Sequence, residues 1–347
     1  MGEEMNALLL TQYMRLEMTG MPEPSPGPDE VVVRVRACGI CGSDVHGFDG
    51  STGRRIPPLV MGHEAAGEVA QLGSAVTDLR VGERVTFDST ISCGRCCYCA
   101  AGEVNLCEDR EVMGVSPGSY RRHGAFAELV AVPRRIVYRL PEGIGFEQAA
   151  MIEAVSIALH AVGLIPVRLG DTAVVVGSGM IGLLAVQAAR LAGCTAVVAI
   201  DIDEARLRLA RQLGATEALD GRMGDPAEAV RQLTGGRGAD VVLECLGAAG
   251  TVRTAIACAR KGGTVALVGN LAAAAEVPLQ EVVTRQIRLQ GSCASSGEYP
   301  AAIRLLSTGA IRVDPLISAV APLAEGPAWF ERLYRREAGL MKVILRP

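Results

Sequence analysis

Four cysteines lie close together in the stretch CGRCCYCAAGEVNLC, where they form the pattern C-x2-C-x2-C-x7-C. Four thiolates at this spacing in a Gly-containing loop can converge on one tetrahedral zinc ion, and four-sulfur sites of this kind are normally closed and structural. We therefore expect a structural zinc ion bound by Cys93, Cys96, Cys99 and Cys107. Cys97 is a fifth thiol in the same loop, and spacing alone does not exclude it as a substitute ligand.

A second set of metal-binding side chains is dispersed along the chain: Cys41 in GICGSDVH, His63 and Glu64 in GHE, and Glu153 in MIEAVSIALH. Taken singly, a cysteine is usually a small buried residue and a glutamate is usually a solvated charge. Taken together, these residues offer a metal few protein ligands and one open position. Alcohol oxidation requires such an open site, because a Lewis acid must lower the pKa of the bound hydroxyl before hydride leaves.

A dinucleotide-binding fingerprint, GSGMIG, follows the apolar run AVVV and opens a helix-like stretch. In this G-x-G-x-x-G pattern Gly177 permits a tight turn, Gly179 lets the backbone approach a pyrophosphate, and Gly182 allows close helix–strand packing. Asp201 ends the next strand-like run, where its carboxylate can accept hydrogen bonds from ribose hydroxyls and would repel a 2′-phosphate. The pattern therefore favours NAD over NADP. The alternative is an ordinary Gly-rich turn with a helix-capping aspartate.

Two kinds of element must position these residues, and they divide the chain. Up to about residue 150 the sequence contains short strand-like runs between Gly/Pro turns, as at 31–38, 83–87 and 126–132, which predicts an all-β domain. From about residue 171 to residue 289 apolar strands alternate with amphipathic helices, which predicts a parallel sheet with crossover helices. A helix-like stretch at 299–307 and the final run MKVILRP have no place in that sheet, so we expect them to return to the first domain.

Composition narrows the class of protein. A length of 347 residues favours two domains, and 34 Lys+Arg against 38 Asp+Glu without a basic run disfavours a nucleic-acid partner. The acidic N-terminus and the lack of a long apolar run disfavour secretion and membrane insertion, so we expect a cytoplasmic protein. In that compartment the eleven cysteines indicate metal ligands and not a disulfide framework.

GICGSDVH, GHE, the four-cysteine loop and VGSGMIG with its downstream aspartate occur in the order and spacing of the zinc-containing medium-chain dehydrogenase/reductase family. The chain resembles that family over essentially its whole length. Glu153 in the context E-x-V-S-x-A-L-H resembles the sorbitol (polyol) dehydrogenase branch, whereas the liver alcohol dehydrogenase branch has a cysteine there. The resemblance implies an α/β plus β fold, with a GroES-like catalytic domain (1–155 and 292–347) and an inserted Rossmann NAD-binding domain (156–291). It also implies two zinc ions per chain and a homo-oligomer, a dimer or tetramer.

The resemblance also assigns roles to residues of the catalytic site. Cys41 and His63 would be ligands of the catalytic zinc, with Glu64 and Glu153 as direct or water-linked partners. Three residues of the GICGSDVH motif would serve the reaction: Ser43 would contact the substrate oxygen, Asp44 would fix local geometry, and His46 would relay the proton to solvent through the cofactor ribose. His46 has an alternative interpretation as a partly exposed turn histidine.

Further residues are assigned to the cofactor by the same resemblance. Met180 and Ile181 would lie under the cofactor, and Arg206 would stack near the adenine. The nicotinamide side would be lined by Val268, Gly269 and Asn270.

The expected substrate site departs from sorbitol dehydrogenase. Gly47 replaces a Tyr that follows the relay histidine, which predicts added space, and Ala294 and Ser295 replace an Arg–Tyr pair for polyol hydroxyls. Sites that hydrogen-bond a substrate hydroxyl dominate discrimination, so these changes disfavour sorbitol itself. An anionic group on the substrate is an alternative, since the loop arginines Arg54, Arg121 and Arg122 could bind it.

The function predicted from these observations is oxidation of a secondary alcohol, in a polyol, diol or sugar-derived alcohol, to a ketone with NAD. A threonine-type amino-alcohol dehydrogenase would keep the same zinc and cofactor motifs. A zinc-free quinone reductase would lack the ligands that Cys41, His63 and Glu153 supply. A non-catalytic dinucleotide-binding protein on the same scaffold would be expected to have lost the relay or the ligands.

Overall fold

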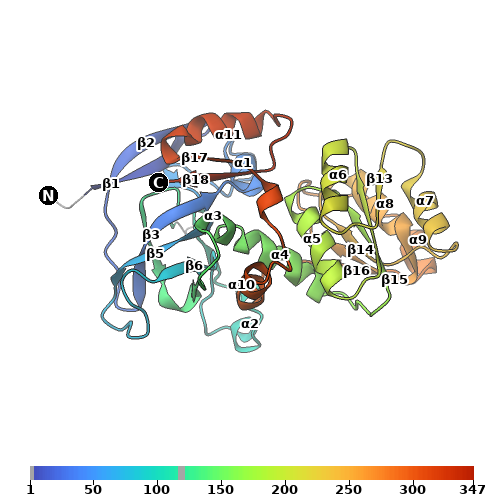
Figure 1. Cartoon of the computed structure of the whole chain (residues 1–347), viewed down its shortest axis with the longest axis horizontal. Helices are drawn as coiled ribbons and strands as arrows, with labels where there is room; N and C mark the ends of the chain where they lie inside the picture. The colour runs from blue at the N-terminus through green and yellow to red at the C-terminus, as the bar shows by residue number, and fades with distance from the viewer. Residues whose placement is uncertain (1–3, 116–121) are drawn as a thin grey trace. The chain divides into compact units, whose positions relative to one another are not determined.

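The computed structural model describes residues 4–115 and 122–347, which form two compact units. Unit 1 comprises Met1–Glu153, Tyr299–Thr308 and Val313–Pro347, and unit 2 comprises Ala154–Glu298 and Gly309–Arg312 (Figure 1). The sequence predicted that the NAD-binding domain ends at residue 291, whereas unit 2 of the structure continues to Glu298 and also includes Gly309–Arg312. The segment 292–298 belongs to unit 2, where Glu298 Oε1 lies 2.8 Å from Nδ1 of His160.

Unit 1 is a β structure with β3 (Glu30–Gly39) at its centre. The valines of β3 alternate with arginines from Val33 onward, so one face of the strand is buried. In the described part of the chain β3 belongs to a seven-stranded sheet of order β10-β6-β5-β3-β18-β17, with β9 also paired to β3. The other strands are β5 (Glu64–Leu72), β6 (Arg84–Phe87), β9 (Leu129–Pro133), β10 (Val137–Arg139), β17 (Ile317–Pro322) and β18 (Lys342–Arg346).

Smaller elements complete unit 1. The strands β1 (Glu4–Gln12), β2 (Arg15–Pro22) and β4 (Leu59–Val60) form a separate sheet, and β7 (Thr90–Ile91) pairs with β8 (Glu111–Val112). The helices are α1 (Gly42–Gly47), α2 (Cys97–Ala100), α3 (Phe146–Ala149), α10 (Tyr299–Ser307) and α11 (Gly326–Tyr334), with short 3-10 turns at Val104–Leu106, Arg134–Ile136, Asp314–Leu316 and Leu323–Glu325. Both C-terminal segments, α10 and β18, lie in unit 1.

Aromatic side chains tie the C-terminal helix α11 to the strands. Phe330 of α11 lies 5.7 Å from Phe126 and 5.6 Å from Phe48, measured between ring centroids, and all three side chains are buried. Aromatic contacts at these distances add to the burial of apolar area. The core of unit 1 therefore joins residues from both ends of the chain, next to the short helix α1.

Unit 2 is a parallel sheet of order β13-β12-β11-β14-β15-β16 among the described residues. Its strands are β11 (Thr172–Val176), β12 (Ala196–Asp201), β13 (Glu217–Asp220), β14 (Ala239–Glu244), β15 (Ala259–Leu267) and β16 (Arg288–Gly291). Its helices are α4 (Ile152–Gly163), which begins before the boundary, α5 (Met180–Leu191), α6 (Glu204–Gln212), α7 (Pro226–Leu233), α8 (Ala249–Cys258) and α9 (Leu279–Thr284). The central strands β11, β12 and β14 are mostly apolar and buried, as expected where both faces of a sheet are covered, whereas the edge strand β16 is largely exposed. The predicted alternation of strands and helices is confirmed.

The strand order of unit 2 reverses beside β11, which pairs with β12 on one side and β14 on the other. Ligands of open parallel sheets bind at the carboxyl ends of the strands next to such a reversal. The fingerprint glycines follow β11 directly. No helix in the described part of the chain is both long and apolar enough to cross a membrane.

Candidate functional site

The pairing of β3 with β5 brings together three of the predicted metal ligands. In this antiparallel register Gly39 lies opposite Glu64, so the residues just past one strand meet those just before the other. Cys41 follows β3 as the N-cap of α1, and His63 precedes β5. The ligand atoms of Cys41, His63 and Glu64 all lie within 4.8 Å of one another. One thiol, one imidazole and one carboxylate form a donor set that suits zinc.

Asp44 orients the imidazole of His63. His63 Nδ1 lies 3.4 Å from Asp44 Oδ1, while His63 Nε2 faces Ser43 Oγ at 3.4 Å. Burial alone would lower the pKa of His63, but the charges of Asp44 and Cys41 raise it well above its usual value. Nδ1 is buried without a hydrogen bond of normal geometry. A carboxylate on this side of a histidine leaves the other ring nitrogen for a metal, which is the usual arrangement at zinc sites.

Glu64 is held by a residue that the sequence did not single out. Its Oε2 accepts a short hydrogen bond from Lys342 Nζ, and Lys342 also donates to the Ile40 carbonyl at 3.1 Å. Both side chains are buried, with 2% and 3% of the surface exposed. Two buried charges in contact compensate each other. The signal in the sequence was a lone lysine in the apolar strand MKVILRP, whose partner is far away along the chain.

Glu153 stands near the start of α4 and is not part of the three-ligand group. Burial raises the pKa of Glu153 to about 7; the charge of Glu64 raises it as well, while His63 and Lys342 lower it. The side chain therefore feels the charges of the cluster. The structure brings Cys41, His63 and Glu64 together directly and leaves Glu153 beyond that group.

The four-cysteine loop forms a compact cluster of its own. The Sγ atoms of Cys93, Cys96, Cys99 and Cys107 all lie within 4.8 Å of one another, whereas the exposed Cys97 is outside the group. Backbone N–H groups of Cys99 and Glu108 lower the pKa of Cys96 to about 6, whereas burial raises the pKa of Cys107 to about 11. The cluster has the four thiols of a closed zinc site.

Ser43 and His46 lie in α1, directly after Cys41. Ser43 Oγ accepts a hydrogen bond of 3.1 Å from Arg55 Nη2. His46 lies in the last turn of α1 and is exposed, so it is in contact with solvent. Arg55 is 4% exposed and is a further residue that the sequence did not single out. No sequence signal separates it from its exposed neighbour Arg54.

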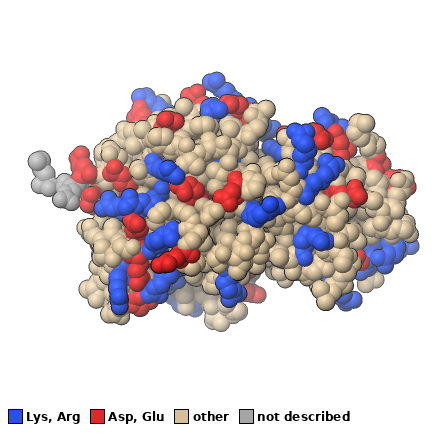
Figure 2. Space-filling model, in the orientation of Figure 1, with Lys and Arg blue, Asp and Glu red and all other residues tan. Residues whose placement is uncertain are grey.

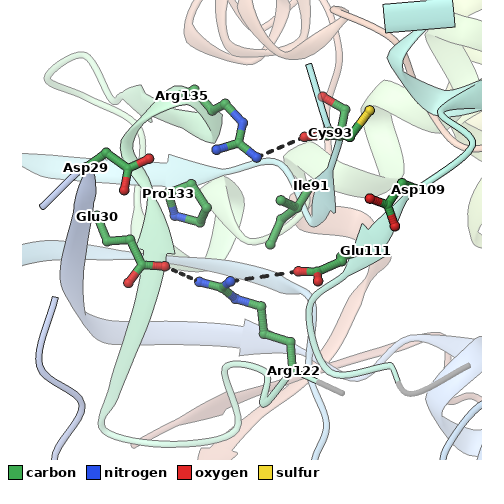
Figure 3. Close-up of a pocket in the computed structure, with 10 residues that line it drawn as sticks. Asp29, Glu30, Ile91, Cys93, Asp109, Glu111, Arg122, Pro133 and Arg135 are labelled. Atoms are coloured by element: carbon green, nitrogen blue, oxygen red, sulfur yellow. Dashed lines mark hydrogen bonds and ion pairs between the residues drawn. The ribbon is translucent and has the colours of Figure 1, made fainter. Parts of the chain in front are cut away.

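Two expectations about the substrate site are wrong. A Cβ atom at Gly47 would lie 2.3 Å from Arg55 Cγ, so the space beside Gly47 is filled and not open. Arg122 is not available for an anion, because its guanidinium lies 2.6 Å from Glu30 and 3.9 Å from Glu111 (Figure 3). Arg54 is exposed, and Arg121 lies outside the described residues.

Two of the three fingerprint glycines in unit 2 are required by the backbone, Gly177 by its conformation and Gly182 by a close contact. Gly177 has φ +93°, which a side chain disfavours, and Gly179 is the N-cap of α5. A Cβ atom at Gly182 would lie 1.8 Å from the Gly177 carbonyl oxygen, so only glycine lets α5 pack this close. Met180 and Ile181 form the first turn of α5. Their N–H groups belong to a helix N-terminus, which favours an anionic ligand.

Asp201 lies at the end of β12 and fixes the fingerprint loop. One carboxylate oxygen accepts from Ser178 N at 2.6 Å, and the other accepts from Ile202 N and Asp203 N. The cap of α6 is Asp203, which accepts from Ala205 N and Arg206 N. The interpretation of Asp201 as a helix-capping aspartate is therefore wrong.

The loop after β15 lies at the same edge of the sheet. Val268 N and Gly269 N both donate to the Glu244 carbonyl, at 2.9 Å and 3.0 Å. A Cβ atom at Gly269 would lie 2.1 Å from Gly247 N, so the two loops touch through glycines. Asn270 follows in the same loop. The predicted cofactor residues thus lie at or just after the carboxyl ends of β11, β12 and β15, except Arg206, which lies in the first turn of α6.

Comparisons with known proteins agree with this geometry. Residues 27–142 match the alcohol dehydrogenase GroES-like domain, and residues 181–308 match the zinc-binding dehydrogenase family. The sorbitol dehydrogenase of Bacillus subtilis (strain 168) is 32% identical over 99% of this chain and 98% of its own.

Two solved structures are similar over nearly the whole chain. A protein described as a zinc-binding dehydrogenase from Sinorhizobium meliloti 1021, bound to NADP, is 38% identical with a TM-score of 0.93, covering 99% of this chain and 100% of that chain. An alcohol dehydrogenase from Escherichia coli CFT073, complexed with NADH, is 28% identical with a TM-score of 0.91 and covers 100% of both. The chain therefore belongs to the zinc-containing medium-chain dehydrogenase/reductase family, in its polyol branch, and is a zinc-dependent, NAD-linked alcohol dehydrogenase.

Proposed function

We propose that this enzyme oxidises a secondary hydroxyl of a polyol, diol or sugar-derived alcohol to a ketone, with unit 1 as the catalytic domain and unit 2 as the NAD-binding domain. The observation that carries the proposal is the group of Cys41, His63 and Glu64 beside Ser43 in unit 1. The buried His63 ring, which Asp44 orients through Nδ1, and the mixed thiol, imidazole and carboxylate donors fit a zinc ion with an open position.

Cys41 and His63 would hold the metal, with Glu64 and Glu153 as direct or water-linked partners. When bound, zinc supplies a Lewis acid that lowers the pKa of a substrate hydroxyl. Ser43 takes the hydroxyl proton and gives up its own, and the exposed His46 delivers that proton to solvent. Asp44 keeps the His63 ring in place throughout. When bound, NAD would supply the acceptor for the hydride that leaves the substrate carbon.

Lys342 determines which role Glu64 can take. While Lys342 Nζ is bonded to Glu64 Oε2, that oxygen is partly occupied. The bond uses one lone pair of Oε2 and the lysine offsets the charge of Glu64, so it competes with a metal ion for this carboxylate. This supports Cys41 and His63 as the constant ligands, and Glu64 and Glu153 as the ones that change with the stage of the reaction.

We also propose that the chain binds two zinc ions, lies in the cytoplasm and forms a homo-oligomer. The four-thiol cluster supports a second, structural zinc ion, bound by Cys93, Cys96, Cys99 and Cys107, with Cys97 as a spare thiol. The eleven free cysteines support a reducing compartment such as the cytoplasm. The family resemblance supports a homo-oligomer, a dimer or tetramer.

A second candidate substrate class is a hydroxy amino acid. The L-threonine 3-dehydrogenase of Symbiobacterium thermophilum is 37% identical over 94% of this chain and 93% of its own. Such a substrate carries charges, which favours a site with charged partners. The predicted substrate loop offers Ala294 and the buried Ser295, neither of which is charged. This supports the uncharged polyol or diol class.

A substrate screen tests the proposal. Purified enzyme with NAD is given secondary alcohols, diols, polyols, polyol phosphates, hydroxy amino acids and primary alcohols, and formation of reduced cofactor is followed by absorbance. We expect the largest kcat/KM on a secondary diol or polyol, with sorbitol a poor substrate. A larger value for threonine, for a primary alcohol or for sorbitol would overturn the substrate class and leave the zinc and NAD chemistry standing.

A further inference from the structure

Arg55 is a buried cation beside the catalytic site. Its Nη2 donates to Ser43 Oγ at 3.1 Å and to Asp44 Oδ1 at 2.9 Å, and its Nε donates to the same carboxylate oxygen at 3.2 Å. Asp44 is fully buried, and Arg55 and His63 share its negative charge. Burial alone would raise the pKa of Asp44, but His63 and Arg55 lower it well below the usual range. The guanidinium is therefore anchored by three hydrogen bonds, two of them to a buried carboxylate.

Gly47 makes the approach of this arginine possible. A Cβ atom at position 47 would lie 2.3 Å from Arg55 Cγ and 3.1 Å from Arg55 Cβ, so the stem of the arginine runs over the glycine Cα. These are atoms near the backbone end of the side chain, which have little freedom to move aside. The glycine after His46 and the arginine eight positions later are therefore one packing unit.

The chemistry of the two groups fixes the direction of their hydrogen bond. Arginine has only donors, while a serine hydroxyl has one donor and two acceptor lone pairs. Ser43 must therefore accept from Arg55, and its proton must point elsewhere. One lone pair and the proton remain for the substrate hydroxyl and the proton relay. A charged donor also stabilises negative charge on Ser43 Oγ as its proton leaves.

We propose that Arg55 is a positioning residue of this dehydrogenase, which acts through Ser43. Anchored on Asp44, it holds the serine hydroxyl so that Oγ accepts the substrate proton while the serine gives up its own. The inference rests on the proposed role of Ser43 in the relay. It assigns a function to Arg55 that neither its position in the sequence nor its exposure to substrate would suggest.

A double-mutant cycle tests the proposal. In Arg55→Met the stem over Gly47 is kept and the donors are lost, and Arg335→Met is the control at an exposed arginine outside the site. We expect Arg55→Met to slow the first turnover by roughly a hundredfold, the lower end of what a proton-transfer group contributes, with bound zinc unchanged. In a Ser43→Ala background the same substitution should have no further effect on the rate, because its partner is already absent. Arg335→Met should keep the native rate.

Arg55→Met leaves the charge of Asp44 with less compensation and can fail to fold. Arg55→Lys covers that case, since it keeps a cation beside Asp44 but lacks the fork that reaches two acceptors at once. We expect it to fold with full zinc content and to turn over more slowly than the native enzyme. A native rate in either folded variant, or an equal loss in the Ser43→Ala background, would overturn the role of Arg55. A native rate in Ser43→Ala itself would instead overturn the proposed relay.

Discussion

The buried carboxylate of Asp44 contacts three other residues of the site. Asp44 accepts from Arg55, lies against His63 and has one oxygen 3.4 Å from Cys41 N, so one buried carboxylate connects a metal ligand to a cation. Its environment explains why a short motif such as GICGSDVH carries so much of the site. The cysteine, the serine and the aspartate must stand within one turn of helix for these contacts to form together.

A substitution at Gly47 tests how tightly this single residue packs against Arg55. Gly47→Ala should lower the free energy of unfolding by about 1–3 kcal/mol, because the new methyl group overpacks the site against Arg55 Cγ at 2.3 Å. The measurement is urea denaturation of the native chain and the variant. In an Arg55→Ala background, where that carbon is missing, most of the cost should vanish. Equal costs in the two backgrounds would show that Gly47 is constrained by its backbone and not by the arginine.

The elements explain which parts of the site could be predicted. The four-cysteine cluster and the fingerprint loop are local in sequence, so spacing alone predicted them, and the structure confirms their convergence. Cys41, His63 and Glu64 meet through the β3–β5 register, which the residues alone do not reveal; the resemblance to a family did. Lys342 reaches Glu64 across 278 positions through the β3–β18 pairing, and no spacing argument anticipates such a contact.

Asp201 connects two elements, because it ends β12 and its carboxylate holds the loop after β11. Asp201→Gly should raise the specificity constant for NADP relative to that for NAD at least about tenfold, because a like-charge contact costs several kcal/mol and 1.4 kcal/mol is tenfold. Steady-state kinetics with both cofactors measures the ratio. Asp201→Asn is the control, because it removes the charge but keeps an acceptor for Ser178 N. A native enzyme that uses both cofactors equally would show that Asp201 does not face the ribose.

The whole molecule separates its two tasks into two units. Both groups of metal-binding residues belong to unit 1, and the fingerprint glycines and Asp201 belong to unit 2. Lys and Arg are interspersed with Asp and Glu over the face shown in Figure 2, so this face has charges of both signs. Each unit has its own apolar core. We therefore expect unit 2 to keep its fold when unit 1 loses its metal ions.

Removal of the metal ions tests this separation. Chelation should first remove the ion of the open Cys41 and His63 site, because that site has fewer protein ligands than the closed four-thiol cluster. Turnover should then fall to background, while NADH binding stays within about twofold of the native affinity, a change of less than about 0.5 kcal/mol. The measurements are metal content, activity and NADH fluorescence on the same samples, with added zinc restoring activity as the control. Turnover without any metal would contradict the zinc chemistry. Loss of NADH binding in step with the first ion would contradict the assignment of cofactor binding to unit 2, since that unit contributes no residue to either metal-binding group.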